Sequence, residues 1–373
     1  MLESDLLYQK RLEKAIARDL VLGYHGSMME INLPHLSRLL SEKLGERIEI
    51  TGCEKIGSGY HSDGFKLSAA NGTCYFLKRV KSRDLGFELP ERQVLSLMMS
   101  HGMVQRSGFA PKSLGVIVDD KHDSVMLPDV DEETVIYHVQ EFQPMGKSCW
   151  SLLQERRQKR KVDEADIAEL ERVTDVLCRL HKIKYPSQDS QQLKNVYNDQ
   201  LRNLLTNPEL TVMLLHDFPQ DHPLLPPQEQ GRYVGLMLQL IHAWKDRSDR
   251  LSALHGDFWG ANVFFHPDGT VGVIDYSRIP WGDPGVDVAW WLAQYLWLFH
   301  ETRNLYFQEL GERFLEMYAK KAADNEIRRA VSLAMGVMGV IYISPRLHPE
   351  LDFKVGRRFL DNVVEILQNQ QFM

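Results

Sequence analysis

The sequence predicts an α+β protein, with strands concentrated in the first part of the chain and helices in the second. Runs such as 74–80 and 135–142 are rich in β-branched and aromatic residues, which favours strands. The segment 165–182 carries apolar residues at helical spacing, which is typical of a helix packed on a core. A chain of 373 residues is long enough to form two lobes with substantial cores.

The predicted elements follow in order along the chain. Residues 1–45 form a helical extension whose first part is amphipathic and mixed in charge, unlike the apolar centre of a signal peptide. Strand-like runs lie at 48–51, 74–80, 116–118, 125–127 and 135–142. Helices are expected at 165–182, 232–246, 288–300 and 330–343. The last is shorter than the roughly 18–20 residues of a membrane span, so we expect a buried helix and no membrane partner.

Composition narrows the class of protein. The net charge of −7 and the pI near 6.1 argue against nucleic acid as the main partner. The basic run 156–161 precedes acidic residues, so we expect a solvated loop or helix end there. The four cysteines form no Cys-x-x-Cys pair, which predicts free thiols, neither zinc site nor disulfide framework, and a cytoplasmic location.

The segment 254–287 carries the most chemistry. It contains His255-Gly256-Asp257, then Asn262 and Asp275, and two strand-like runs separate the last two residues. Between these runs, at 266–270, Pro and Gly favour a turn. A hairpin at this place would bring Asn262 and Asp275 close together.

Phosphoryl transfer from a nucleoside triphosphate needs such groups. One residue orients the nucleophile, and oxygen ligands hold Mg²⁺ on the phosphates. Asn262 and Asp275 provide the hard oxygen ligands that Mg²⁺ prefers. Asp257, on the preceding loop, is placed to orient or deprotonate a hydroxyl group. The segment therefore predicts a kinase active site that uses ATP or GTP with Mg²⁺.

Residues 254–289 resemble the catalytic region of the aminoglycoside phosphotransferase and choline kinase family, the small-molecule kinases of the protein-kinase-like fold. The shared pattern is His-Gly-Asp, four residues, Asn, a strand ending in Ile-Asp, and a Gly-Asp-Pro…Asp helix start. Gly256 stands where protein kinases carry Arg, and Asp275 begins Asp-Tyr-Ser in place of Asp-Phe-Gly. Both departures favour the small-molecule branch.

This resemblance implies a two-lobed protein-kinase-like fold. A small N-lobe with an antiparallel sheet, at 46–142, would bind the nucleotide, and a larger, mainly helical C-lobe, at 143–373, would hold catalytic and substrate-binding residues. The loop at 54–66 would approach the phosphates through Gly57, Gly59 and Ser62. A hairpin turn without a ligand is the alternative interpretation of this loop.

The resemblance also implies roles for charged and backbone groups. Lys78 would reach the phosphates, with Arg79 and Lys81 as competing candidates. Its ion-pair partner would be Glu91, or alternatively Glu88. Main-chain groups near Glu141 and Phe142 would bond the base of the nucleotide. His255 would brace the catalytic loop by hydrogen bonding, and Asp287 would support the same loop from a helix.

Other residues in this region are expected to be structural. Asp283 followed by Pro284 predicts a helix start with an N-cap. Cys178 and His181 are expected to be core and cap residues. The aromatic density of 288–300 indicates a packed core rather than a stacking platform.

The resemblance implies that loops of the C-lobe bind the acceptor. Candidate loops lie at 184–192 and 206–230, the second with Asp217, Asp221 and His222, and Glu301 and Glu309 lie further on. The acceptor hydroxyl could belong to an aminoglycoside-like antibiotic, a sugar, an amino alcohol or an amino acid. The alternatives are a nucleotide-binding pseudokinase, disfavoured because the key residues are present, and a protein kinase, disfavoured by Gly256.

Overall fold

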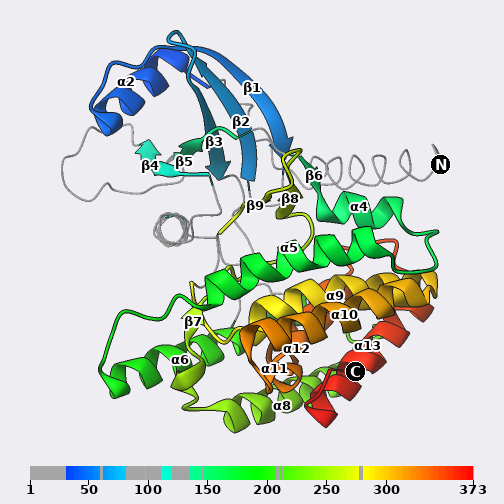
Figure 1. Cartoon of the computed structure of the whole chain (residues 1–373). Helices are drawn as coiled ribbons and strands as arrows, with labels where there is room; N and C mark the ends of the chain where they lie inside the picture. The colour runs from blue at the N-terminus through cyan, green and yellow to red at the C-terminus, as the bar shows by residue number, and fades with distance from the viewer. Residues whose placement is uncertain are drawn as a thin grey trace. The chain divides into compact units, whose positions relative to one another are not determined.

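The computed structural model describes residues 31–58, 62–80, 97, 111–119, 135–143, 146–206, 210–211, 213–276 and 280–372 (Figure 1). These residues separate into two compact units. The first comprises the described residues up to Cys53 together with Ser68–Thr73, and the second comprises Glu54–Leu67 and the rest of the chain from Cys74. The predicted divisions after residues 45 and 142 stay predictions.

The first unit contains helix α2 (Leu33–Leu44). Asn32 caps its first turn, and the helix ends at Gly45, whose φ of 71° suits a residue without a Cβ. The hydroxyl group of Ser41 accepts a hydrogen bond from the Ile48 N–H at 2.8 Å, which ties the helix to the chain leading into β1. This helix lies inside the predicted N-terminal helical extension.

A five-stranded sheet runs in the order β1-β2-β3-β5-β4. β5 is antiparallel to both β3 and β4. β1 begins in the first unit and β2 ends in it. The strands are β1 (Ile50–Ser58), β2 (Ser62–Ala69), β3 (Cys74–Val80), β4 (Ser113–Asp119) and β5 (Val135–Glu141). The predicted strand at 125–127 lies outside the described residues.

Helices form most of the remaining chain (Figure 1). They are α4 (Cys149–Glu155), α5 (Glu164–His181), α6 (Ser190–Leu205), the π-helix η1 (Met213–Asp217), α8 (Pro227–Trp244), the 3₁₀-helix η2 (Ser248–Arg250), α9 (Gly285–Thr302), α10 (Leu305–Ala322), α11 (Ile327–Ala330), α12 (Ser332–Ile343) and α13 (Phe353–Asn369). The predicted α+β class, with an antiparallel sheet and a mainly helical part, is confirmed.

The core of the helical part is centred on α9, which packs against α10, α12 and α13. Its tryptophan and tyrosine residues are buried, which confirms that they form a packed core. The apolar run predicted at 330–343 is buried as well, and the chain breaks it at Val331 into α11 and α12. Among the described residues, no helix is both long and apolar enough to cross a membrane.

Two small sheets contain strands from the segment around 254–287, which was predicted to form the active site. β8 (Val263–Phe265) pairs antiparallel with β9 (Val271–Val273), which confirms the predicted hairpin, and β6 (Lys147–Ser148) extends it on the other side of β8. β7 (Ser252–Ala253) pairs with β10 (Trp281–Gly282). The second pair joins the chain before the catalytic loop to the chain that follows the hairpin.

We expect replacement of Gly146 by alanine to destabilise the junction of β6 and the hairpin. A Cβ at this position would lie 1.7 Å from the carbonyl oxygen of Phe265, a backbone atom that cannot move without breaking the β6–β8 pairing. The free energy of unfolding should fall by about 1–3 kcal/mol, as for other overpacked sites. Thermal or urea unfolding measures this change.

The matched control is Gly235→Ala in helix α8, where an added Cβ would meet nothing within 4 Å. Alanine is the better helix former, so this variant should be as stable as the wild type or more stable. A Gly146→Ala protein as stable as the Gly235→Ala protein would contradict the packing described here.

Candidate active site

The catalytic loop follows β7 and turns at Gly256, whose φ is 81°. Asn262 closes this loop, because its Nδ2 donates to the backbone oxygen of Asp257 at 2.9 Å and to the Asp257 carboxylate oxygen Oδ2 at 3.1 Å. Asp257 and Asn262 are both buried. The loop and the hairpin therefore hold the predicted catalytic carboxylate and the predicted metal-binding amide in direct contact.

His255 connects the loop to the strand that leads to Asp275. Its Nδ1 accepts a hydrogen bond from the Asp257 N–H at 3.2 Å, so Nδ1 carries no proton. Its Nε2 lies 2.8 Å from the carbonyl oxygen of Ile274 and must donate to it. Both ring nitrogens of a neutral imidazole are thus engaged. The ring therefore links the backbone at Asp257 to the carbonyl group of Ile274.

Asp287, in the first turn of α9, lies under the loop. Its fully buried carboxylate accepts hydrogen bonds from the N–H groups of His255, at 2.8 Å, and Gly256, at 2.7 Å. His181 Nε2 lies 3.1 Å from the same carboxylate, and Tyr318 bonds the other ring nitrogen at 2.6 Å. His181 is a buried residue, as predicted, but its contact with Asp287 was not predicted.

Lys78 forms an ion pair with Asp275, which lies 197 positions later in the sequence, with 2.5 Å between Nζ and Oδ1. Asp275 lies two residues beyond the end of β9, and the N–H of the intervening Ile274 donates to the backbone oxygen of Asn262 at 3.0 Å. Its φ of 63° lies in the left-handed region, which is unfavourable for residues other than glycine and recurs at functional sites. The structure therefore brings together Lys78, Asp275, Asn262 and, through Asn262, Asp257.

The contacts of the neighbouring residue distinguish Lys78 from Arg79. Successive side chains of a strand point to opposite faces of the sheet. Arg79 donates to Asp63 at 3.3 Å, and its guanidinium lies 5.1 Å from the ring centre of Phe65. Arg79 is thus engaged within the sheet, whereas Lys78 is the one that reaches Asp275. Lys81, the third candidate, lies outside the described residues.

The predicted phosphate loop is described in part. Gly57 lies near the end of β1 and Ser62 begins β2. Gly59 lies outside the described residues, and so do Glu91 and its alternative Glu88. The ion pair predicted for Lys78 on the following helix therefore stays a prediction.

Asp63, beside this loop, was not singled out from the sequence. Its buried carboxylate accepts a hydrogen bond from the Ser58 hydroxyl group at 2.7 Å and pairs with Lys55 at 3.0 Å and Arg79 at 3.3 Å. These contacts join the end of β1, the start of β2 and β3. The sequence signal that could have identified it is an aspartate that lies between Gly59 and Gly64 in a strand-like run.

The backbone at Glu141 and Phe142, where the base of the nucleotide is predicted to bind, already makes hydrogen bonds within the protein. The Glu141 N–H donates to the Lys112 oxygen at 2.8 Å, and the Phe142 N–H donates to the Cys74 oxygen at 3.4 Å. The Phe142 ring lies 4.9 Å from Lys66 Nζ. These two N–H groups already donate to backbone oxygens within the protein. Binding of the base at Glu141 and Phe142 stays a prediction.

A buried ion pair between Arg250 and Asp283 stabilises the β7–β10 pair. Arg250 donates to Asp283 at 2.7 and 3.1 Å and to Asp324 at 2.8 and 2.9 Å. The Tyr197 hydroxyl group also donates to Asp283, at 2.8 Å. Asp283 was predicted only as a helix N-cap. Its carboxylate does accept from the Gly285 N–H, but α9 begins one residue later than expected, at Gly285.

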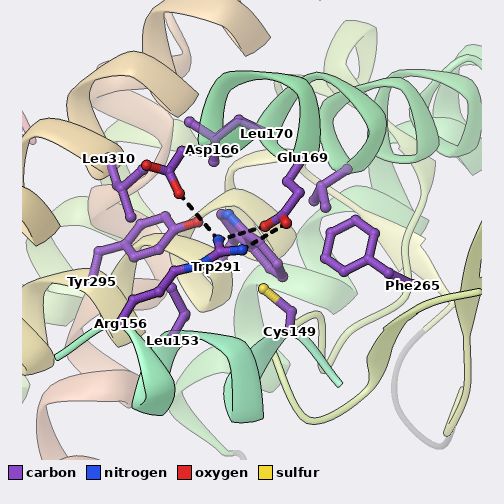
Figure 2. Close-up of a pocket in the computed structure, with 11 residues that line it drawn as sticks. Cys149, Leu153, Arg156, Asp166, Glu169, Leu170, Phe265, Trp291, Tyr295 and Leu310 are labelled. Atoms are coloured by element: carbon purple, nitrogen blue, oxygen red, sulfur yellow. Dashed lines mark hydrogen bonds and ion pairs between the residues drawn. The ribbon is translucent and has the colours of Figure 1, made fainter. Parts of the chain in front are cut away.

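A small cavity of about 10 Å³, room for one water molecule, lies between α4, α5 and α9. None of the predicted site residues lines it (Figure 2). Figure 2 shows Arg156 between Asp166 and Glu169, and its bonds to Glu169 are 2.6 and 2.7 Å long. The basic run that begins at Arg156 was predicted to be a solvated loop or a helix end. Arg156 directly follows the last residue of α4, so it lies at a helix end. Its pairing with Glu169 and Asp166 of α5 was not predicted.

The chain is similar to known proteins in sequence pattern and in fold. A sequence model of the phosphotransferase enzyme family matches residues 52–331. A search of curated protein sequences gave no match. A thermostable mutant of aminoglycoside phosphotransferase APH(4)-Ia, in a ternary complex with ADP and hygromycin B, is 14% identical with a TM-score of 0.50, over 89% of this chain and 98% of that chain. This likeness is one of fold.

Two further solved structures are similar at lower scores. A putative fructosamine-3-kinase from Haemophilus somnus 129PT is 12% identical with a TM-score of 0.48, over 88% of this chain and 96% of that chain. The amicoumacin kinase hAmiN, in complex with AMP-PNP, Ca²⁺ and Ami, is 14% identical with a TM-score of 0.46, over 85% and 88%.

Proposed function

Because this chain belongs to the phosphotransferase enzyme family, we propose that it transfers the γ-phosphoryl group of ATP or GTP to a hydroxyl group of a small molecule, with Mg²⁺. The family match confirms the resemblance predicted from the residues and the expected class of enzyme, a small-molecule kinase. The observation that carries the proposal is the convergence of Lys78, Asp275, Asn262 and Asp257.

Lys78 and Asp275 form the phosphate end of the proposed site. The ammonium group of Lys78 binds phosphate oxygens, and its pair with Asp275 holds it in place before the nucleotide arrives. Gly57, Gly59 and Ser62 are proposed to line the phosphates from the other side. Glu91 is proposed as the second carboxylate on Lys78.

Asn262 and Asp275 fit a magnesium ion by the chemistry of their donors. The Asn262 amide nitrogen is turned toward Asp257, which leaves its oxygen as the ligand atom, and Asp275 supplies a carboxylate. Among the described residues no cluster of three or more His, Cys, Asp or Glu forms a metal cage, and Mg²⁺ on a nucleotide needs only such a partial set. When bound, the ion neutralises charge on the phosphates.

Asp257 acts on the acceptor. Its carboxylate orients the acceptor hydroxyl group and takes its proton as the new oxygen–phosphorus bond forms. The contact with Asn262 fixes the direction of this carboxylate, and His255 and Asp287 hold the loop on which it lies. Phe258, which is fully buried beside it, helps to exclude water from the site.

The base of the nucleotide is proposed to bind at the chain following β5. Since the N–H groups of Glu141 and Phe142 serve the sheet, the base would use the Glu141 carbonyl oxygen and the N–H of Gln143. On this proposal residues 46–142 form the nucleotide-binding lobe and 143–373 form the catalytic and substrate-binding lobe.

We expect acceptor-dependent release of nucleoside diphosphate by the purified protein. The assay contains Mg²⁺, ATP or GTP, and a panel of aminoglycosides, macrolides, amino alcohols, sugars and amino acids. Asp275→Ala should lose this release, because it removes a metal ligand and the partner of Lys78.

The control is Asp268→Ala, an exposed aspartate in the turn of the same hairpin, whose carboxylate contacts Thr270. It should keep the wild-type rate. Equal acceptor-dependent release by Asp275→Ala and the wild type would contradict the proposal. Nucleotide binding without release for any acceptor would favour the pseudokinase instead.

A further inference from the structure

Helix α9, whose Asp287 holds the start of the catalytic loop, contacts this loop at two further points. The Trp291 ring lies 5.4 Å from the Phe258 ring, centre to centre. One turn later, Gln294 Oε1 accepts a hydrogen bond from the Gly260 N–H at 3.0 Å. Side chains spaced by four and then three residues lie on one face of a helix. One face of α9 therefore supports the loop from its start to a point near its end.

The side chain of Gln294 is fully buried, and only one of its two polar atoms is paired. Because the Gly260 N–H is a donor, the atom that faces it must be the oxygen Oε1. The nitrogen Nε2 is buried without a hydrogen-bond partner among the residues that the structure describes. An unpaired buried donor lowers the stability of a folded protein, so packing alone would favour an apolar side chain here. The bond to Gly260 is the contact that requires the glutamine.

The backbone at Gly260 is held from a second side by α4. The Gly260 oxygen accepts a hydrogen bond at 2.9 Å from the N–H of Trp150, in the first turn of that helix. A Cβ at position 260 would lie 2.5 Å from Gln294 Oε1 and 2.7 Å from the Trp150 nitrogen, so only glycine fits between these two atoms. Gly260 is therefore clamped between α9 and α4.

This clamp is connected to the catalytic residues by hydrogen bonds. The Gly260 N–H and the Trp259 carbonyl group belong to one planar peptide group. Gln294 fixes the N–H end of this group, and its carbonyl end accepts the Asn262 N–H at 2.9 Å. Asn262 Nδ2 in turn donates to the Asp257 carboxylate at 3.1 Å. A rotation of that peptide group would therefore move Asn262 and change the direction of the Asp257 carboxylate.

We propose that Gln294 is a positioning residue for phosphoryl transfer, which acts through Gly260 and Asn262 on the Asp257 carboxylate. This inference rests on the proposed function and adds to it a residue that acts through the backbone of the loop. Asp287 fixes the start of the loop, and Gln294 fixes the part that leads into the hairpin. A displacement of about 1 Å at a reacting group can cost on the order of 100-fold in rate.

The test replaces Gln294 with methionine, which has a similar shape but only a weak hydrogen-bond acceptor. With the best acceptor, kcat should fall about 10- to 100-fold, whereas the dissociation constant of the nucleotide should stay within about twofold of the wild-type value. The melting temperature should stay within about 3 °C, because the variant loses the unpaired Nε2 donor together with the bond to Gly260.

Conservative variants separate the hydrogen bond from the packing. Gln294→Glu keeps an oxygen at the same place along the side chain, so kcat should stay within about threefold of the wild-type value. Gln294→Asn keeps the amide but is one methylene shorter, so it should lose kcat as Gln294→Met does, and it carries the test if Gln294→Met does not fold. Gln239→Met, at an exposed position of α8, is the matched control and should behave as the wild type.

Two further measurements separate positioning from general damage. In the Asp257→Asn background, Gln294→Met should lower kcat by no more than about twofold, because the carboxylate that it positions is already absent. Amide hydrogen exchange of residues 257–262, followed by mass spectrometry, should be faster in Gln294→Met than in the wild type. This second readout does not depend on activity.

The inference is overturned if Gln294→Met keeps the wild-type kcat, if Gln294→Glu loses as much kcat as Gln294→Met, or if the loss is undiminished in the Asp257→Asn background. Failure of the proposed function has a different signature. The wild type would then release no nucleoside diphosphate with any acceptor, while hydrogen exchange would still show whether Gln294 holds the loop.

Discussion

Replacing Asp257 with asparagine is expected to lower kcat by about a thousandfold, within the range for loss of a general base. The amide cannot take a proton from the acceptor hydroxyl group. Its oxygen can still accept the hydrogen bond that Asn262 gives to Oδ2, so the loop should keep its shape. The dissociation constant of the nucleotide should therefore stay within about twofold of the wild-type value, because the phosphates bind at Lys78 and Asp275.

Steady-state kinetics with the best acceptor and calorimetric titration with the nucleotide measure the two quantities. Asp268→Asn, in the exposed turn between β8 and β9, is the matched control and should behave as the wild type in both. A large loss of nucleotide affinity in Asp257→Asn would indicate that the loop had collapsed and that the kinetic loss had another cause.

Replacing Arg250 with alanine is expected to have the largest effect on stability, a loss of about 3–5 kcal/mol in the free energy of unfolding. Arg250 is nearly buried, and its guanidinium makes the only ion pair of Asp283 among the described residues. Asp283 would remain fully buried with hydrogen bonds from Tyr197 and Gly285 but without a compensating positive charge.

Urea unfolding of the wild type and the variant measures this difference. Arg313→Ala breaks an exposed ion pair with Glu309 on one face of α10 and should cost less than about 1 kcal/mol. If the two variants lost equal stability, the buried pair would not be the brace described here. A second measurement is the kcat/KM of Arg250→Ala at a low temperature at which the variant is still folded. The activity that remains shows how far the arrangement of β7 and β10 depends on Arg250.

The parts of the site that the sequence predicted are those with local signals. The hairpin follows from a turn of Pro and Gly between two apolar runs, and the register Val263↔Val273 then places Asn262 beside Ile274. The resemblance to the family favoured Lys78 over Arg79, and the alternation of side chains in β3 separates the two in the structure.

The unpredicted parts depend on contacts between distant segments. Arg250 and Asp283 lie 33 positions apart, and His181 and Tyr318 lie 137 apart. Nothing in the local pattern around either pair states the identity of the partner. The basic run at Arg156 was correctly predicted as a possible helix end, but its ion pairs with Glu169 and Asp166 were not predicted, because these partners lie on another helix, α5.

The most direct test of the account follows the phosphate itself. The protein is incubated with Mg²⁺, nucleoside triphosphate labelled in the γ-phosphate, and the acceptor that gives the highest release of nucleoside diphosphate. We expect the label in a phosphate ester of that acceptor, and its loss in Asp257→Asn while nucleotide binding persists. Label found only as inorganic phosphate, or transferred equally by Asp257→Asn, would contradict a kinase in which Asp257 acts on the acceptor hydroxyl group.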